Sequence, residues 1–329
     1  MKERLSGIIW LITRKCNLSC IHCYVADRFK QELSTEECLR ILREAAELDV
    51  RFVGLTGGEP LIVFDKTRKI VEEAYRLGIS TSIQTNGTLI DRTIAEWLAN
   101  YDVFTYVSLD GPTEEIHDAV RGKGTWSRTI RGIELLSKLD VEFTIVMAVS
   151  KINYKYASSL IELAENLGAC SAAVIPVIRA GRARSNITLN SREWITVLRK
   201  VSEYANELRF PLSIWCAPFA LLVAKSPYVR CYSCRRSSVV DVDPMGRLLL
   251  CDVLDIAIAD LRELRFSEAL KIFDEHPLNI EISEQIPKEC ADCPIREFCR
   301  GGCYARAYIE RGSLNLADPL CPRLADSLH

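Results

Sequence analysis

Cysteines are the residues of this chain whose type and spacing best indicate chemistry, and they form two groups. Cys16, Cys20 and Cys23 have the spacing C-x3-C-x2-C, and eight further cysteines lie between Cys231 and Cys321. Three thiolates on one loop can bind three irons of a 4Fe–4S cluster and leave the fourth iron without a protein ligand. An open coordination position is where a substrate or cofactor binds. The first group therefore predicts a catalytic iron–sulfur cluster.

A zinc site or a structural iron–sulfur loop is the alternative for this first group. Either site would need a fourth ligand close by. His22 is available, but its ring lies between two of the cysteines in the sequence. We therefore interpret His22 as a planar side chain beside the cluster rather than as a metal ligand.

The composition is that of a globular protein from a reducing compartment. The chain has 329 residues, is 48% hydrophobic and 26% charged, and carries a net charge of −2. Its length is compatible with roughly two domains. The charge pattern gives no attraction to nucleic acid or to membranes, and no apolar run approaches the ~20 residues that cross a bilayer. Because the N-terminal segment has no signal-peptide pattern, we expect a cytoplasmic protein whose 14 cysteines stay reduced and available to metal.

Short apolar runs alternate with amphipathic segments from residue 7 to about residue 206. Runs typical of strands cover 7–12, 51–56, 79–84, 103–109, 141–149 and 172–177. Between the first two, Ser34 and Glu37 form a predicted capping box at the start of a helix. Repeated βα units predict parallel strands, in either an α/β barrel or an open doubly wound sheet. In both folds, functional residues lie at the carboxyl ends of the strands.

The pattern changes after residue 208, where loops, short strands and cysteines replace the βα units. We predict a barrel core over residues 1–208, a linker over 209–230 and a cysteine-rich domain over 231–329.

Three polar motifs follow the second, third and fourth predicted strands in order. They are Gly57-Gly58-Glu59-Pro60, Thr85-Asn86-Gly87 and Ser108-Leu109-Asp110-Gly111, with His117 to Arg121 a few residues further on. Together with the C-x3-C-x2-C segment, these motifs resemble those of the radical S-adenosylmethionine (radical SAM) superfamily, and the resemblance covers nearly the whole chain.

The resemblance implies a partial (β/α)6 TIM-type barrel and a set of contacts to S-adenosylmethionine. Gly57, Gly58, Glu59 and Pro60 would contact its amino group, with Thr85 and Asn86 beside them, and Ser108 and Asp110 would meet its ribose. Arg121 would pair with its carboxylate, His22 would pack near the adenine, and Tyr24 would be a further contact to the cofactor. A reduced 4Fe–4S cluster would then cleave the cofactor to a 5′-deoxyadenosyl radical that abstracts hydrogen from a substrate.

The second group of cysteines resembles the SPASM extension of radical SAM enzymes. The resemblance implies two auxiliary 4Fe–4S clusters. Cys231, Cys234, Cys251 and Cys303 would bind the first; Cys290, Cys293, Cys299 and Cys321 would bind the second. The chain would thus hold three clusters in all. Two zinc sites are the alternative, because paired C-x2-C motifs also bind zinc. If Cys234 were not a ligand, the first auxiliary cluster would have an open iron.

Cysteines outside these sets have no assigned metal. Cys38 and Cys170 are predicted to be ordinary buried thiols. Cys216 precedes the second group. It is interpreted in the same way, with a ligand or substrate-contacting thiol as the alternative.

Auxiliary clusters with four protein ligands are suited to electron transfer, and an oxidation also needs a base to accept a proton. Asp252, directly after Cys251, resembles the base of the anaerobic sulfatase-maturing enzymes. Alternatively, Asp252 binds a loop amide, because Asp255 and Asp260 show that the whole stretch is rich in aspartate.

The substrate is predicted at the level of class. The first hypothesis is a peptide or protein side chain, with the chain acting as a peptide maturase and any peptide-recognition domain supplied by a separate protein. The second is a small cofactor precursor such as a tetrapyrrole, because the segment from Trp10 to Tyr24 also resembles haem-pathway members. A remote alternative is a non-catalytic iron–sulfur electron carrier. A flavodoxin- or ferredoxin-type protein would be the electron donor.

Overall fold

The computed structural model describes residues 5–26 and 28–325. Its strands form one sheet in the order β11-β10-β9-β1-β2-β3-β4-β5-β6-β7-β8. The strand bounds are β1 Gly7–Thr13, β2 Phe52–Gly57, β3 Ser80–Thr85, β4 Phe104–Ser108, β5 Phe143–Val149, β6 Ser171–Pro176, β7 Leu212–Ile214, β8 Val229–Cys231, β9 Val239–Val242, β10 Arg247–Leu249 and β11 Ala257–Asp260.

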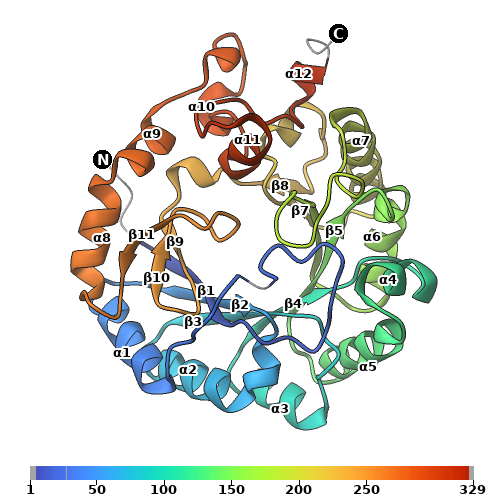
Figure 1. The fold of residues 1–329 in the computed structure, drawn as a ribbon. Coiled ribbons are helices and arrows are strands. Elements are labelled where there is room, and N and C mark those ends of the chain that lie inside the picture. The colour runs from blue at the N-terminus through green and yellow to red at the C-terminus, as the bar shows by residue number, and fades with distance from the viewer. Residues whose placement is uncertain (1–4, 27, 326–329) are drawn as a thin grey trace.

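Strands β1 to β8 are all parallel and pair in chain order. The helices between them are α1 Thr35–Ala46, α2 Phe64–Arg76, α3 Arg92–Asn100, α4 Glu114–Arg121, α5 Thr125–Lys138, α6 Ala157–Asn166 and α7 Ser191–Glu207. They lie around the outside of the curved sheet (Figure 1). Six βα units around a curved parallel sheet confirm the predicted partial barrel.

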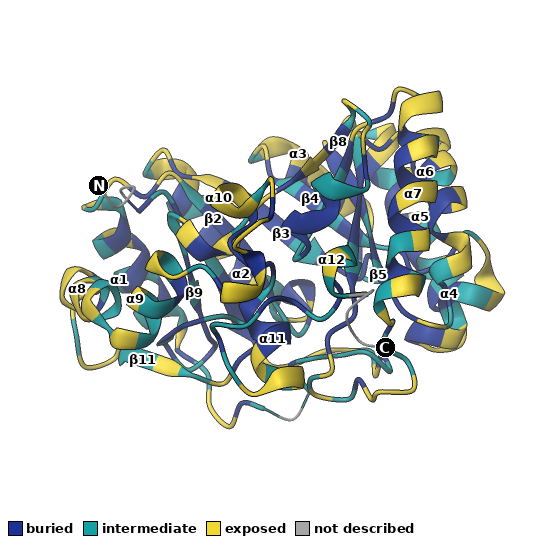
Figure 2. Ribbon diagram, turned by 90° about the horizontal axis from the view of Figure 1, so that it is seen from above, coloured by how far each residue is buried: buried dark blue, intermediate teal, exposed yellow. Residues whose placement is uncertain are grey.

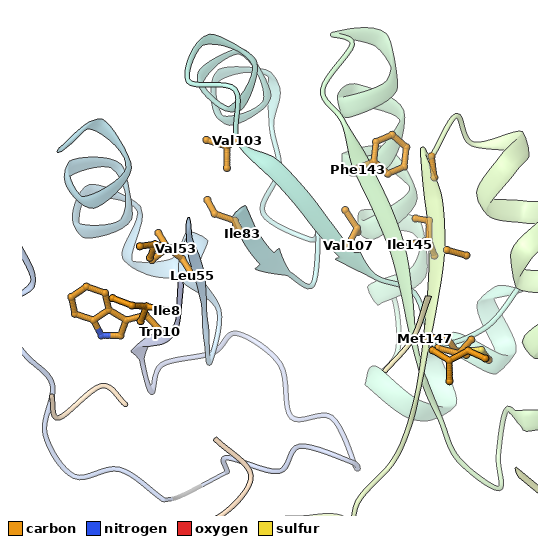
Figure 3. Packing of buried hydrophobic residues seen from close by; sticks show 14 of the residues in the cluster. Ile8, Trp10, Val53, Leu55, Ile83, Val103, Val107, Phe143, Ile145 and Met147 are labelled. Carbon is orange, nitrogen blue, oxygen red and sulfur yellow. The ribbon is translucent and has the colours of Figure 1, made fainter. Parts of the chain in front are cut away.

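Apolar side chains from neighbouring strands make the core that holds the barrel together. Ile8 and Trp10 of β1 and Val53 and Leu55 of β2 are each 0% exposed, and they lie close together in Figure 3. Fully burying one such side chain contributes roughly 1.5–3 kcal/mol. The core therefore fixes the strands whose carboxyl ends bear the polar motifs.

Helix starts follow the local sequence. Ser34 caps α1, and its reciprocal hydrogen bonds with Glu37 confirm the predicted capping box. Asn190 and Glu193 form a second box before α7. These caps satisfy backbone N–H groups that a helix leaves unpaired at its start.

The sheet extends beyond the predicted barrel on both edges. Strands β7 and β8 arise in the segment predicted as a linker and add to the β6 edge. On the other edge β9 pairs in parallel with β1, and β10 and β11 continue it as antiparallel strands. The cysteine-rich region thus begins within the sheet itself, and the division into a core, a linker and a C-terminal domain stays a prediction.

The rest of the C-terminal region is made of short helices and loops. The helices are α8 Phe266–Glu275, α9 Pro277–Glu284, α10 Arg296–Cys299, α11 Tyr304–Arg311 and α12 Pro322–Ala325. Figure 2 shows how buried residues concentrate along the strands and on the inner faces of the helices. Within residues 5–26 and 28–325, no helix is long and apolar enough to cross a membrane.

Candidate active site

The loop after β1, residues 14–24, carries the first three cysteines and is here called the cluster loop. Hydrogen bonds from two other segments hold its backbone. The Ile21 amide donates to the carbonyl of Val120 at 3.1 Å. Arg182 donates its Nε to the Cys20 carbonyl and its amide to the Cys23 carbonyl, both at 2.9 Å. Arg182 thus anchors the loop.

Gly57 and Gly58 bring the end of β2 directly against the cluster loop. The Gly58 amide donates to Thr13 O, and the Glu59 amide donates to Lys15 O, both at 2.7 Å. A Cβ added to Gly58 would lie 2.1 Å from Lys15 O, and one added to Gly57, where φ is +130°, would lie 2.4 Å from Thr13 O. Only glycine permits this approach. Both glycines therefore position the cluster loop.

Glu59 joins the polar motifs that follow β2 and β3. Its carboxylate accepts hydrogen bonds from the Thr85 hydroxyl at 2.8 Å, the Asn86 amide at 2.7 Å and the Leu61 amide at 3.0 Å. Burial raises the pKa of Glu59 above its usual range, although the three donors act to lower it. The Asn86 side chain donates in turn to Asn17 of the cluster loop at 2.9 Å. These residues form what we call the Glu59 network, which connects three motifs. It includes Asn17, which the sequence analysis did not identify.

Asp110 and Arg121 form a buried ion pair next to Cys20. Arg121 Nε donates to Asp110 Oδ2 at 2.6 Å, and Arg121 Nη1 lies 4.0 Å from Cys20 Sγ. Burial acts to raise the pKa of Asp110, but the charge of Arg121 leaves it below its usual value. Since Nε is engaged by Asp110, the terminal nitrogens of Arg121 are held at the cluster side of the pair. Ser108 lies at the end of β4, two residues before Asp110.

His22 and Tyr24 of the cluster loop face different partners. His22 Nε2 lies 3.8 Å from Asp110 Oδ2, and burial lowers the pKa of His22 to about 4. Within the described residues its Nδ1 has no hydrogen-bond partner. A neutral ring with an unpaired buried nitrogen fits a bound group that supplies the missing contact. The Tyr24 hydroxyl instead donates to Asp252 at 2.6 Å, so Tyr24 faces the second cysteine region.

Asp252 belongs to a cluster of acidic and thiol groups. Asp241 Oδ2 accepts the Asp252 amide at 2.8 Å, and Cys251 Sγ lies 3.7 Å from Asp252 Oδ1. The ligand atoms of these three residues lie within 4.8 Å of one another. Burial, and then the charge of Asp252, raise the pKa of Asp241. Asp241 lies in β9 and was missed, because a lone aspartate in a strand gives no sequence signal.

The cysteines predicted to bind the second auxiliary cluster surround one pocket. Its thiol-bearing residues are Cys290, Cys293, Cys299 and Cys321. Burial raises the pKa of Cys299 to about 12 and that of Cys321 to about 11 in the absence of metal. Thiolates crowded without a cation are unfavourable, whereas cluster iron would stabilise them. This enclosed site fits a fully ligated cluster.

Another group of thiols surrounds Cys303, at the start of α11. Cys234 and Cys251 both lie close enough to Cys303 for their charges to interact. Interaction with the nearby Cys216 thiol lowers the pKa of Cys303 to about 7. Cys231, predicted as a ligand here, has its thiol directed to the carbonyl of Pro218 at 3.6 Å.

A buried ion pair supports the Cys303 segment. Arg306 Nη1 donates to Asp318 Oδ2 at 2.6 Å, and the same oxygen accepts the Cys303 amide at 2.9 Å. Arg306 also reaches the carbonyl of Cys216 at 3.3 Å. Asp318 could have been noticed from its place three residues before Cys321, but its partners are brought together only by the fold.

Comparison with known proteins agrees with this geometry. Residues 10–164 match the family model of the Radical SAM superfamily. The chain is 30% identical to AdoMet-dependent heme synthase of Methanosarcina barkeri, over 95% of both proteins. The chain belongs to the radical SAM superfamily. It is therefore an enzyme that uses S-adenosylmethionine and an iron–sulfur cluster, and its C-terminal cysteine pattern is of the SPASM type.

Further relatives of this radical SAM enzyme include a maturase. The chain is 29% identical to mycofactocin maturase MftC of Mycolicibacterium smegmatis, over 95% of this chain and 82% of that protein. Its fold is similar to that of Streptococcus suis SuiB bound to the precursor peptide SuiA. The TM-score is 0.78 at 20% identity, and the match covers 96% of this chain and 75% of SuiB. At that identity the likeness to SuiB concerns the fold alone.

Proposed function

We propose that this radical SAM enzyme modifies a side chain of a peptide or protein and holds three 4Fe–4S clusters, one catalytic and two auxiliary. The observation that carries the proposal is the convergence of the cluster loop, the Glu59 network and the Asp110–Arg121 pair at the carboxyl ends of β1 to β4. When bound, the reduced cluster and S-adenosylmethionine supply a 5′-deoxyadenosyl radical that takes a hydrogen atom from the substrate.

The chain's own residues bind and orient the cofactor. Cys16, Cys20 and Cys23 are the proposed iron ligands. The terminal nitrogens of Arg121, held beside Cys20, would bind the cofactor carboxylate as a fork of donors. The backbone of Gly57 to Pro60 would meet its amino group.

Other groups at the strand ends complete the cofactor site. Thr85 and Asn86 border the Glu59 network. Ser108 and Asp110 would meet the ribose, with Asp110 acting mainly through its pair with Arg121. His22, which is neutral and whose Nδ1 has no hydrogen-bond partner among the described residues, would lie against the adenine.

Asp252 is the proposed proton acceptor. It lies between the two cysteine regions, because Oδ2 accepts from Tyr24 next to Cys23 while Oδ1 lies 3.7 Å from Cys251. A substrate radical formed near the cluster loop could thus lose its proton to Asp252 and its electron to an auxiliary cluster. A flavodoxin- or ferredoxin-type donor would supply the electron that starts the reaction, and a separate recognition protein would present the peptide.

A tetrapyrrole is the second candidate substrate. It is favoured by the similarity to AdoMet-dependent heme synthase, which extends over 95% of both chains. Peptide modification is favoured by the mycofactocin maturase relative and by the SuiB fold with its bound precursor peptide.

One experiment separates the two candidates. Extract from a deletion strain is divided into a peptide fraction and a tetrapyrrole fraction, and each is added to the anaerobically reconstituted enzyme with S-adenosylmethionine and dithionite. The proposal predicts that the peptide fraction stimulates release of 5′-deoxyadenosine and that a peptide in it changes mass. Stimulation by the tetrapyrrole fraction alone would support the second candidate and contradict the first.

A further inference from the structure

We infer that Cys216, and not Cys231, is the fourth ligand of the first auxiliary cluster, with Cys234, Cys251 and Cys303. The inference rests on the auxiliary clusters of the proposed function and changes the ligand set that the sequence pattern suggested.

Cys216 lies close to other proposed ligands of the first auxiliary cluster. It follows β7 by two residues, at the carboxyl edge of the parallel strands. Its thiol is close enough to Cys303 for the two thiols to interact. It is also close enough to Cys234 for the charges of the two thiols to interact. Cys216 therefore shares one site with two of the cysteines already assigned to this cluster.

The backbone around Cys216 is held in an unusual conformation. Cys216 has φ +52°, in the left-handed region that side chains other than glycine, asparagine and aspartate rarely adopt. The Arg306 guanidinium donates a hydrogen bond to the carbonyl of Cys216 at 3.3 Å, and the Arg306 amide donates to Cys303 Sγ at 3.4 Å. Backbone strain of this kind is retained where the surroundings impose it, frequently at functional sites. Here one arginine fixes both cysteines.

The segments bearing Cys234 and Cys303 are also tied together. Arg235, buried next to Cys234, donates its Nε to Gly302 O at 3.3 Å and its Nη2 to Leu314 O at 3.0 Å. Gly302 immediately precedes Cys303, so these bonds bring Cys234 to the same site. Cys251 also lies close enough to Cys303 for the charges of the two thiols to interact.

Cys231 has a different environment. It is the last residue of β8 and pairs in register with Ile214, which is 0% exposed in the core. Its thiol interacts with the backbone of Pro218 and Leu221. A thiol that packs in a strand behaves as a small apolar side chain. The C-x2-C spacing of Cys231 and Cys234 is therefore not a ligand pair.

The test uses a parent protein in which Cys16, Cys20 and Cys23 are all replaced by alanine, so that only auxiliary clusters remain. The proposed function predicts about eight irons per chain in this parent. Cys216→Ala, Cys231→Ala and Cys303→Ala are then compared in it by iron and sulfide analysis and by EPR of the oxidised and reduced proteins. Circular dichroism checks that each variant folds.

We expect Cys231→Ala to retain about eight irons and the parent spectra. Cys216→Ala and Cys303→Ala should share one defect, either a fall to about four irons or a three-iron signal on oxidation. Cys216→Ser, whose hydroxyl can replace the thiolate, should keep the iron with an altered spectrum of the reduced cluster. Cys216→Ser provides the test if Cys216→Ala does not fold.

Two results would overturn the inference. One is loss of the first auxiliary cluster in Cys231→Ala, and the other is a Cys216→Ala protein with the iron content and spectra of the parent. A parent that holds zinc and no cluster iron would contradict the auxiliary clusters of the proposed function, and the ligand assignment with them.

Discussion

Replacing Glu59 by glutamine keeps the shape of the side chain and removes the charge that joins the polar motifs. The carboxylate accepts from Thr85 and Leu61 through Oε1 and from Asn86 through Oε2. A glutamine carbonyl placed at Oε1 keeps the first two bonds, but its NH2 group then faces the Asn86 amide, donor against donor. The flipped rotamer places the NH2 group against the Leu61 amide instead.

The expected loss follows from these contacts. Removing one charge-assisted hydrogen bond and leaving a buried donor unsatisfied costs about 1–3 kcal/mol for each group. Part of this is offset because the neutral side chain no longer buries a charge, an effect seen in the raised pKa of Glu59. We expect Glu59→Gln to lower the free energy of unfolding by about 2 kcal/mol.

Anaerobic urea titration followed by circular dichroism measures this change as a shift in midpoint at constant slope. Glu96→Gln is the matched control, because Glu96 is 48% exposed and pairs with Arg92 on the surface of α3. The control should change stability by less than about 0.5 kcal/mol. Equal midpoints for Glu59→Gln and the native protein would refute the reasoning that the ionised carboxylate holds the motifs together.

Other predictions address the cluster loop, the C-terminal ion pair and pH. Gly58→Ala would place a methyl group 2.1 Å from Lys15 O, so the loop must move; we expect destabilisation by about 1–3 kcal/mol and loss of the catalytic cluster by iron analysis, and full iron content would contradict this. Asp318→Asn would leave the buried Arg306 without its counter-charge. We expect the free energy of unfolding, measured by urea titration, to fall by about 3–5 kcal/mol, and a midpoint equal to that of the native protein would contradict this. Burial holds the pKa of His117 at about 4, below its usual 6.5, so the stability it contributes is present above pH 6.5 and is lost as pH falls towards 4. The stability difference between the native protein and His117→Asn should therefore shrink by about 2 kcal/mol from pH 7 to 5, and a difference independent of pH would show the interpretation to be wrong.

The sequence pattern predicted parallel βα units because its strands are apolar runs with clear helix caps between them, and the resemblance to the radical SAM superfamily implied that these units form a barrel. Trp10 and Leu55 lie in such runs, and Ser34 begins α1 as its capping box predicts. The polar motifs were predicted to converge because the carboxyl ends of parallel strands share one edge. Local pattern and global fold agree in this part of the chain.

The extensions of the sheet were not predictable in the same way. Strands β7, β8 and β10 each have three residues, too short for a periodic signal. The pairing of β9 with β1 joins residues more than 220 positions apart, and no local pattern specifies so distant a partner.

Spacing along the chain is also a better guide to which cysteines lie together when they are close in the sequence than when the fold brings distant ones together. Cys290, Cys293, Cys299 and Cys321 line one pocket, and their binding of one cluster stays a prediction. Cys216 and Cys303 come together only in the fold, where Arg306 of α11 donates to the Cys216 carbonyl. The contribution of Asp241 to the Asp252 cluster likewise depends on the register of β9.

Cleavage of S-adenosylmethionine tests the central claim most directly. The protein is purified without oxygen, reconstituted with iron and sulfide, and incubated with S-adenosylmethionine and dithionite. The account predicts 5′-deoxyadenosine from the native protein and none from the variant with Cys16, Cys20 and Cys23 all replaced by alanine. An iron-loaded native protein that forms no 5′-deoxyadenosine, or a variant that forms as much as the native protein, would contradict it.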